Sequence, residues 1–270
     1  MSVTVRHPAV AGRFYSRNPG TLLADLHSYI SPRQETISAL GCVVPHAGYI
    51  YSGRVAGAVY ARLNIPRQCF LMCPNHTGMG PPLSIMSAGA WETPLGSVPI
   101  DSALANKIKQ RCSLLSEDVE AHRAEHGAEV QLPFLQALRP DFTFVPIALG
   151  TAQFELLENL GQAMAEVVAA QDDRVLMIAS SDMNHYESDP VTRIKDHKAI
   201  EPILALDARG LFDVVMNENI SMCGFGPAVA MLTAARQLGA TAAELVQYAT
   251  SGDVSGDHEM VVGYAGIVVR

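Results

Sequence analysis

Three apolar runs that each end in a histidine decide the predicted fold of this chain. They are Val43-Val44-Pro45-His46, Phe70-Leu71-Met72-Cys73-Pro74-Asn75-His76 and Leu176-Met177-Ile178-Ala179-Ser180-Ser181-Asp182-Met183-Asn184-His185. Short runs that are apolar throughout are typical of strands that helices cover on both faces. Parallel strands of an open α/β sheet have their carboxyl ends at one edge, where such folds place their ligand crevice. We therefore expect three histidines that are distant in the sequence to converge on one site.

Outward from these runs, helix and strand signals alternate through most of the chain. Helices are expected over 52–63, 101–112, 125–138, 154–170, 191–206, 208–215 and 227–238, and further strands over 84–87, 96–100, 142–149, 245–250 and 261–269. No linker, low-complexity block or internal repeat divides the 270 residues. We therefore predict a single α/β domain over residues 1–270, with a central, mostly parallel or mixed sheet flanked by helices.

The composition limits the class of partner. The formal net charge of −8 argues against a nucleic-acid surface, because phosphate binding needs concentrated Lys and Arg. The N-terminus lacks the charged-then-apolar build of a signal peptide, and no apolar stretch approaches the ~20 residues that span a bilayer. We expect a cytoplasmic protein that binds neither nucleic acid nor membrane. The five cysteines are an odd number for a reducing compartment, so we expect thiols rather than disulfides.

The first two strand ends carry the clearest candidates for chemistry. His46 is followed by two glycines, which let backbone approach a bound group, and its imidazole is suited to be a metal ligand or a base. His76 follows the next strand, and a divalent metal needs ligands from different elements. The alternative for each is a loop histidine bonded to backbone. Neighbouring polar side chains are candidate substrate contacts: Tyr49, Tyr51 and Asn75.

The third strand end and a late cysteine add further candidates. Asp182 is suited to orient a histidine or bind metal, and His185 to donate a proton to a substrate or oxygen, unless the two form a plain loop ion pair. Cys223 precedes the helix entry Gly224-Phe225-Gly226-Pro227, where the helix dipole favours the thiolate that metals bind. The remaining cysteines of the strand runs, Cys42, Cys69 and Cys73, are better explained by packing.

Two other segments permit more than one interpretation. His122-Arg123-Ala124-Glu125-His126 matches the H-x-x-E-H motif of inverted zinc peptidases, which would put both histidines on one helical face. Alternatively, His126 and Glu129 border the main site, and His126 is a candidate substrate contact. The loop 250–258 follows a late strand, and Asp253 in it is a candidate substrate contact, although its composition is also that of a simple turn.

The series of motifs resembles the Memo family and, within it, the prokaryotic group called AmmeMemoRadiSam system protein B. The matching segments are 8–15, 45–53, 74–78, 125–126, 129–134, 180–186, 221–224 and 250–256. They cover nearly the whole chain in order. The resemblance implies a domain similar to class III extradiol dioxygenases, which use non-heme iron(II). It also implies an ion held by His46, His76 and Cys223, with Asp182 and His185 beside it. Radical-SAM and AMMECR-type proteins are the implied partners.

The implied ligand set differs from that of the dioxygenases, whose iron is held by two histidines and a carboxylate. A thiolate is a softer ligand than a carboxylate, so copper and zinc become alternatives to iron(II). Iron(II) is our first expectation. The leading hypothesis is a redox enzyme in which His185 acts as acid or base and Asp182 orients it by a hydrogen bond. Its substrate, a small molecule or peptide, is unidentified. The alternatives are a non-catalytic module that binds a peptide or protein, and a zinc-dependent hydrolase.

Overall fold

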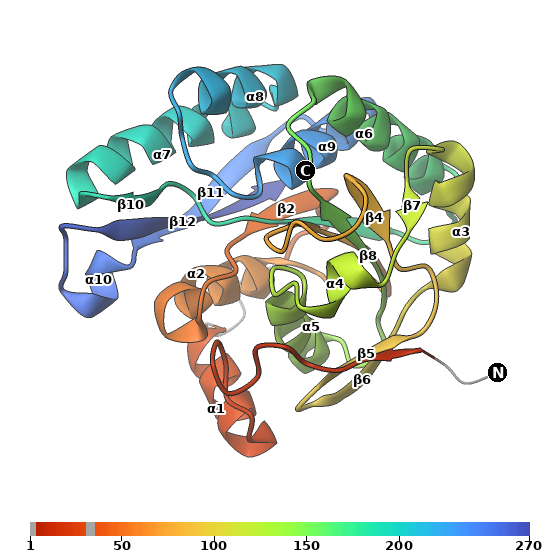
Figure 1. Cartoon of the computed structure of the whole chain (residues 1–270), viewed down its shortest axis with the longest axis horizontal. Helices are drawn as coiled ribbons and strands as arrows, with labels where there is room; N and C mark the ends of the chain where they lie inside the picture. The colour runs from red at the N-terminus through yellow and green to blue at the C-terminus, as the bar shows by residue number, and fades with distance from the viewer. Residues whose placement is uncertain (1–3, 31–35) are drawn as a thin grey trace.

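The three histidine-terminated runs lie next to one another at the centre of a large sheet (Figure 1). A computed structural model describes residues 4–30 and 36–270. In it, β2 (Gly41–Val44) and β3 (Gln68–Pro74) flank β9 (Val175–Ser180), and both pair with β9 in parallel. The parallel strand β8 (Thr143–Leu149) continues the sheet beyond β3. The predicted parallel centre of the sheet is confirmed, and its strand ends point to one edge.

The outer strands of this sheet are mostly antiparallel, which makes it a mixed sheet. The full order is β10-β12-β2-β9-β3-β8-β4-β7, with β11 also paired to β12. Beyond β2 lie β12 (Val261–Val269), β11 (Ala243–Thr250) and β10 (His185–Glu187); beyond β8 lie β4 (Leu83–Ile85) and β7 (Ser116–Glu117). A small second sheet contains β1 (Val5–Arg6), β5 (Ala90–Thr93) and β6 (Gly96–Pro99).

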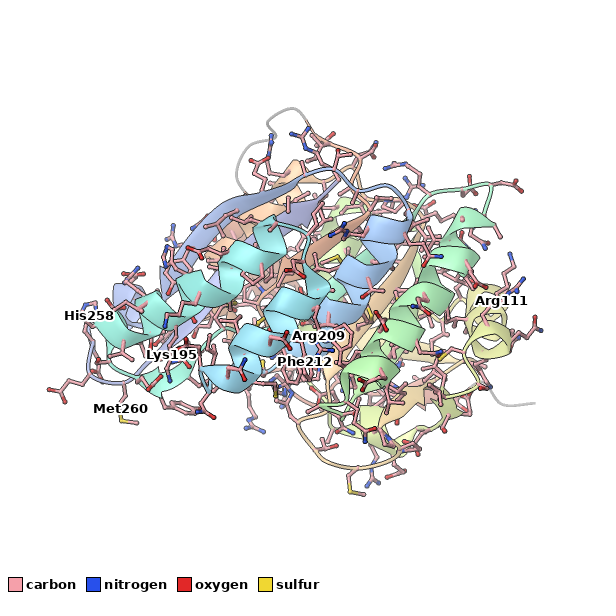
Figure 2. All side chains as sticks on the ribbon, turned by 90° about the horizontal axis from the view of Figure 1, so that it is seen from above. Arg111, Lys195, Arg209, Phe212, His258 and Met260 are labelled. Carbon is pink, nitrogen blue, oxygen red and sulfur yellow. The ribbon has the colours of Figure 1, made fainter. Side chains whose placement is uncertain are left out.

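Helices cover both faces of the large sheet, as the apolar runs predict. One face packs against α1 (Pro19–Tyr29), α2 (Tyr49–Arg62) and α5 (Leu132–Leu138). The other packs against α3 (Ser102–Arg111), α6 (Phe154–Ala169), α7 (Asp189–Leu204), α8 (Ala208–Asn217) and α9 (Phe225–Gln237). Figure 2 looks onto this second layer, where α6 to α9 lie side by side.

Alternation along β2 shows how one strand serves both cores. Val43 belongs to the core under α9, whereas Cys42 and Val44 belong to the core under α2. This period of two is the geometry of a strand with both faces buried. Within the described residues, no helix has the length and apolar character needed to cross a bilayer.

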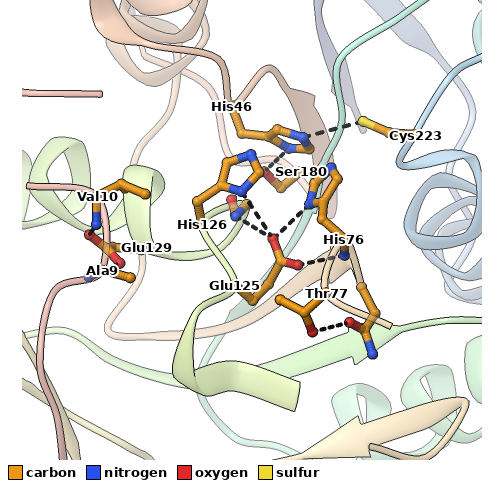
Figure 3. Close-up of polar contacts among 12 residues, drawn as sticks. Ala9, Val10, His46, His76, Thr77, Glu125, His126, Glu129, Ser180 and Cys223 are labelled. Carbon is orange, nitrogen blue, oxygen red and sulfur yellow. Dashed lines mark hydrogen bonds and ion pairs between the residues drawn. The ribbon is translucent and has the colours of Figure 1, made fainter. Parts of the chain in front are cut away.

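The helix expected over 125–138 is the main error in the predicted elements. The chain instead forms α4 (Glu120–Arg123), a loop, the 3-10 turn η1 (Glu129–Gln131) and then α5. Pro133 stands in the first turn of α5, a position that tolerates its missing N–H. The loop between α4 and η1 carries Glu125 and His126 toward the carboxyl edge of the sheet, where Figure 3 shows them.

Candidate metal centre

The structure brings the three expected metal ligands together at the carboxyl edge of the sheet. One ligand atom from each of His46, His76 and Cys223 lies within 4.8 Å of the others. Cys223 Sγ is 3.2 Å from His46 Nε2 (Figure 3). The two histidines follow β2 and β3, and Cys223 precedes α9. Two nitrogens and one sulfur on three separate elements form a set that soft or borderline transition metals prefer.

A glycine lets the start of α9 approach the end of β9. A Cβ atom on Gly224 would lie 2.3 Å from the carbonyl oxygen of Ser180 and 2.4 Å from the Cβ of Ser181. Any side chain at position 224 would therefore push the two elements apart. The backbone N–H of Asp182 also donates to Cys223 Sγ at 3.3 Å, which fixes the sulfur above the strand end.

Hydrogen bonding determines which nitrogen of His46 carries the proton. The Ser180 hydroxyl donates to the carbonyl of Gly127 at 2.6 Å, so it can only accept from its other partners. One of these is His46 Nδ1 at 2.9 Å, which must therefore be the N–H. His46 Nε2 is left with its lone pair toward Cys223. Burial lowers the pKa of His46 to about 3, with a further contribution from His76, so the imidazole is neutral and ready to bind a cation.

His76 is oriented by a buried carboxylate. Glu125 has no exposed surface, and it accepts the His76 backbone N–H at 2.7 Å and His76 Nδ1–H at 2.8 Å. Burial opposes ionisation of Glu125, but the bonds from His76 and from the Gly127 N–H outweigh it and lower its pKa to about 2. His76 Nε2 is therefore the free ligand atom. A carboxylate behind a histidine in this way fixes the ring and raises its basicity as a metal ligand.

His126 places a third imidazole beside the two ligand rings. Its ring stacks on His76 at 4.4 Å between centroids and meets His46 edge-on at 5.4 Å. Burial lowers the pKa of His126 to about 4, assisted by His46 and His76. His76, Glu125 and His126 form a second cluster with ligand spacing. The Glu125 oxygens of this second cluster already accept hydrogen bonds from His76 and Gly127. We therefore interpret the second cluster as residues that hold the first cluster, His46, His76 and Cys223, in place.

An open cleft of about 600 Å³ leads to these atoms. Its lining includes the three candidate ligands together with Phe14, Ala47, Gly48, His126, Asp182, His185, Tyr186, Ser221, Val262 and Tyr264. This volume is within the ~300–1,000 Å³ of small-molecule sites. Both residues predicted for catalysis, Asp182 and His185, therefore lie on the wall of the same cleft as the candidate ligands.

The expected hydrogen bond between Asp182 and His185 is not the one that the structure contains. Nδ1 of His185 donates to the Ser221 carbonyl at 2.8 Å, while the Asp182 carboxylate accepts the backbone N–H of His46 at 2.7 Å. Ser221 is thus the residue that orients His185 and leaves its Nε2 free. Asp182 instead fixes the loop of His46, and burial raises the pKa of its carboxyl group.

The expected thiolate character of Cys223 is a second correction. Burial raises the pKa of this thiol far above its ordinary value, and the neighbouring Asp182 raises it further. These effects exceed the stabilisation of the thiolate by the hydrogen bond from the Asp182 N–H. Without a cation, the sulfur is therefore a protonated thiol, and binding of an ion requires it to lose that proton.

Four residues predicted as substrate contacts lie outside the cleft lining. Tyr49 is buried among aromatic rings and donates to the Val130 carbonyl at 2.6 Å, so it is a core residue. Tyr51 lies on the exposed first turn of α2. Asn75 organises its own loop by bonds to Thr77, Gly78 and Met79. The fifth predicted contact, His126, does line the cleft.

Asp253 is the fourth of these residues and belongs to a structural turn. It lies in α10 (Gly252–Ser255), accepts the Thr250 N–H at 2.7 Å and bonds Arg193 at 2.9 Å. The turn interpretation of loop 250–258 is therefore the better one.

The H-x-x-E-H motif does not form a zinc site. Because α4 ends at Arg123, His122 and His126 do not share a helical face. His122 is fully buried and its ring faces Trp91 at 5.8 Å, away from the cleft. Only Glu125 and His126 of this motif reach the candidate metal centre.

Sequence reasoning missed the supporting residues of the site. Ser180 follows a predicted strand, but nothing in its local sequence distinguishes it from the adjacent serine. Phe14, Val262 and Tyr264 come from segments whose place in the cleft depends on strand order. The early segment containing Phe14 did carry a signal, since it is one of those that resemble the Memo family.

Comparison with known proteins identifies relatives along the full chain. The profile of Memo-like proteins matches residues 6–268. A MEMO1 family protein from Methanosarcina barkeri is 45% identical and covers 98% of this chain and 100% of its own length. Similar proteins from Methanopyrus kandleri and Aquifex aeolicus are each 42% identical over 98% of this chain, which corresponds to 99% and 98% of their own lengths.

A solved structure shares the fold at low sequence identity. It is an uncharacterized protein from Escherichia coli K12, with a TM-score of 0.52 and 12% identity over 83% of this chain and 98% of that one. At this identity the likeness concerns the arrangement of strands and helices alone.

Proposed function

This chain belongs to the Memo-like protein family, and we propose that it is a metal-binding protein whose His46, His76 and Cys223 hold one transition-metal ion for redox chemistry. The observation that carries the proposal is the hydrogen bonding of both imidazoles through Nδ1. Ser180 bonds Nδ1 of His46 and Glu125 bonds Nδ1 of His76, so each ring has its lone pair on Nε2, and that of His46 points to Cys223 Sγ. A histidine that binds a metal typically donates its other ring N–H to a neighbouring group in this way.

Iron(II) is the ion that we propose first, with copper as an alternative. Either ion, when bound, supplies one-electron chemistry to a substrate in the cleft. Three protein ligands leave room for an exogenous one. His185, with Nδ1–H bonded to Ser221, has Nε2 available to accept or return a proton at the substrate. Phe14 and Tyr264 contribute aromatic rings to the cleft wall.

Metal analysis of anaerobically purified protein tests the proposal. We expect about one equivalent of iron or copper per chain in the wild type, and loss of most of it in His46→Ala and Cys223→Ala. Tyr51→Ala, on the same strand-loop-helix unit but outside the cleft, is the matched control and should retain the metal. Wild-type protein without a stoichiometric redox metal would reject the redox function.

A zinc-dependent hydrolase is the second candidate, because two histidines and a cysteine are also a ligand set for catalytic zinc. This alternative predicts zinc rather than iron in the same analysis. It also predicts activity that persists without oxygen or reductant.

The partner proteins expected from the family resemblance, of radical-SAM and AMMECR type, remain part of the proposal. A non-catalytic peptide-binding or protein-binding module would use the same cleft without needing the metal. Cys223→Ser separates these possibilities: unchanged partner binding supports the binding module, whereas loss of binding together with metal supports a metal-dependent complex.

A further inference from the structure

Tyr186 has a backbone conformation that folding alone does not explain. Its φ is +60°, which is strained for a bulky residue other than glycine. The other two such residues in the described chain, Leu206 and Asn219, directly follow the ends of α7 and α8, where this conformation is common. Tyr186 follows no helix. Because 69% of the residue is exposed, burial of its ring contributes little to compensate for the strain.

A β-bulge directs Tyr186 to the mouth of the cleft. His185 pairs with Val262 and Glu187 with Val261, and the register shifts between them, so Tyr186 is the extra residue. Bulges of this kind re-aim side chains and are frequent beside active sites. The preceding His185 is fixed through its backbone N–H and its Nδ1–H, both bonded to Ser221 at 2.8 Å. Tyr186 therefore stands on a rigid base, with its ring centroid 5.7 Å from that of His185.

The composition of the cleft indicates which ligands this ring can face. Phe14, Val262 and Tyr264 give the walls a large apolar share. The described residues that line the cleft include no Lys or Arg. They do include Asp182, which carries a carboxyl group. An anionic group at the outer end of a ligand would find no Lys or Arg partner among these residues. A flat, uncharged group would match both the apolar walls and the face of a tyrosine ring.

We propose that Tyr186 is a specificity-determining residue that stacks on a flat, uncharged ligand whose donor end reaches the His46, His76 and Cys223 centre. The strained backbone is maintained because it holds the ring over the cleft. This inference rests on the proposed metal centre for the position of the ligand's donor end. The strain and the bulge are independent of that centre.

Ligand binding to the cobalt(II)-loaded protein tests the proposal with three probes: imidazole, 4-phenylimidazole and 4-(imidazol-4-yl)benzoate. Calorimetry and the cobalt absorption spectrum report binding. In the wild type, the phenyl group should strengthen binding relative to imidazole, and the carboxylate should remove much of that gain. Tyr186→Gly should reduce the phenyl gain by about three- to tenfold, the usual range for aromatic stacking. Tyr186→Phe and the control Tyr51→Ala should retain the gain.

Denaturation of the metal-free variants supplies a second readout. Glycine relieves the positive φ, so Tyr186→Gly should be at least as stable as the wild type, whereas glycine in an ordinary strand is destabilising. An unchanged phenyl gain in Tyr186→Gly, no phenyl gain in the wild type, or a less stable Tyr186→Gly would overturn the proposal. Failure of the wild type to bind cobalt(II) and imidazole at all would instead reject the metal centre, and the stability comparison would still decide the assignment of strain.

Discussion

At the scale of single residues, the centre depends on groups that bind the ligands rather than on the ligands alone. Ser180 and Glu125 each hold the Nδ1–H of one histidine, and both are fully buried. The approach of His46 and His76 to each other could be predicted from their positions at strand ends. Their supports could not, because Glu125 comes from a loop that the sequence pattern had assigned to a helix.

Replacement of Glu125 tests this support directly. We expect Glu125→Gln to weaken metal affinity by about 10- to 100-fold, since it removes the charge behind His76 while it keeps the side-chain shape. Competition with a chelator of known affinity measures the change. Glu92→Gln is the matched control, because Glu92 also bonds a histidine, His7, but at an exposed position. Equal affinity of wild type and Glu125→Gln would show that His76 needs no carboxylate.

The Cys223 thiol should give the proposed metal binding a pH dependence. Its pKa is raised by burial and by Asp182, so an incoming ion must displace the proton. Affinity for a divalent ion should therefore rise with pH, by about tenfold per pH unit for one released proton. Titrations between about pH 7.5 and 8.5 measure the slope. A slope of zero for this protein would mean that the sulfur is not a ligand, and Cys223→Ser should itself show a reduced slope.

At the scale of elements, contacts of Arg6 and Glu129 bind the N-terminal segment to the loop that carries Glu125 and His126. These contacts are called the clamp. Buried Glu129 binds the Arg6 side chain, accepts the N–H groups of Ala9 and Val10 at 2.8 and 3.0 Å, and accepts the Tyr15 hydroxyl at 2.6 Å. Arg6 also donates to the carbonyl of Glu125 at 2.6 Å. The clamp thus joins segments that are more than a hundred residues apart.

Removal of Glu129 should therefore destabilise the whole fold. We expect Glu129→Ala to lower the free energy of unfolding by about 3–5 kcal/mol, because it leaves Arg6 as a buried charge without its partner. Glu218→Ala is the control: its ion pair with Lys198 is exposed, and its loss should cost at most about 1 kcal/mol. Urea denaturation compares the two. A similar, small effect for both variants would show that the clamp contributes nothing.

The central elements could be predicted from the sequence because periodicity and local signals specify them. Strands β2, β3 and β9 are apolar apart from Gln68 and Ser180 at strand ends, and they begin one or two residues before the apolar runs read from the sequence. The segment 120–131 could not be predicted in this way, since Glu125 and Glu129 have helical spacing but bind distant groups. There, tertiary hydrogen bonds prevail over local pattern, as is common near functional sites.

At the scale of the whole molecule, buried neutral histidines link stability to pH. Burial lowers the pKa of His122 to about 4 and that of His46 to about 3, below the ordinary value near 6.5. The unfolded chain therefore binds more protons than the folded one between these values, and stability falls as the pH drops from about 6.5. Asp196 opposes this trend in part, because burial raises its pKa to about 6.

His122 isolates one contribution to this acid sensitivity, since it lies outside the cleft. We expect His122→Leu to lose less stability than the wild type between about pH 6.5 and 4, by up to about 3 kcal/mol. The measurement is chemical denaturation of the metal-free proteins across this range. Parallel stability curves for the two proteins would contradict the assignment of a neutral His122.

At the carboxyl edge of the sheet, we propose that two imidazole nitrogens and one sulfur bind one ion. X-ray absorption at the edge of the metal found in anaerobically purified protein tests it most directly. We expect two imidazole scatterers and one sulfur at about 2.3 Å, the sulfur being lost in Cys223→Ser. A metal shell of nitrogen and oxygen alone in the wild type would contradict it.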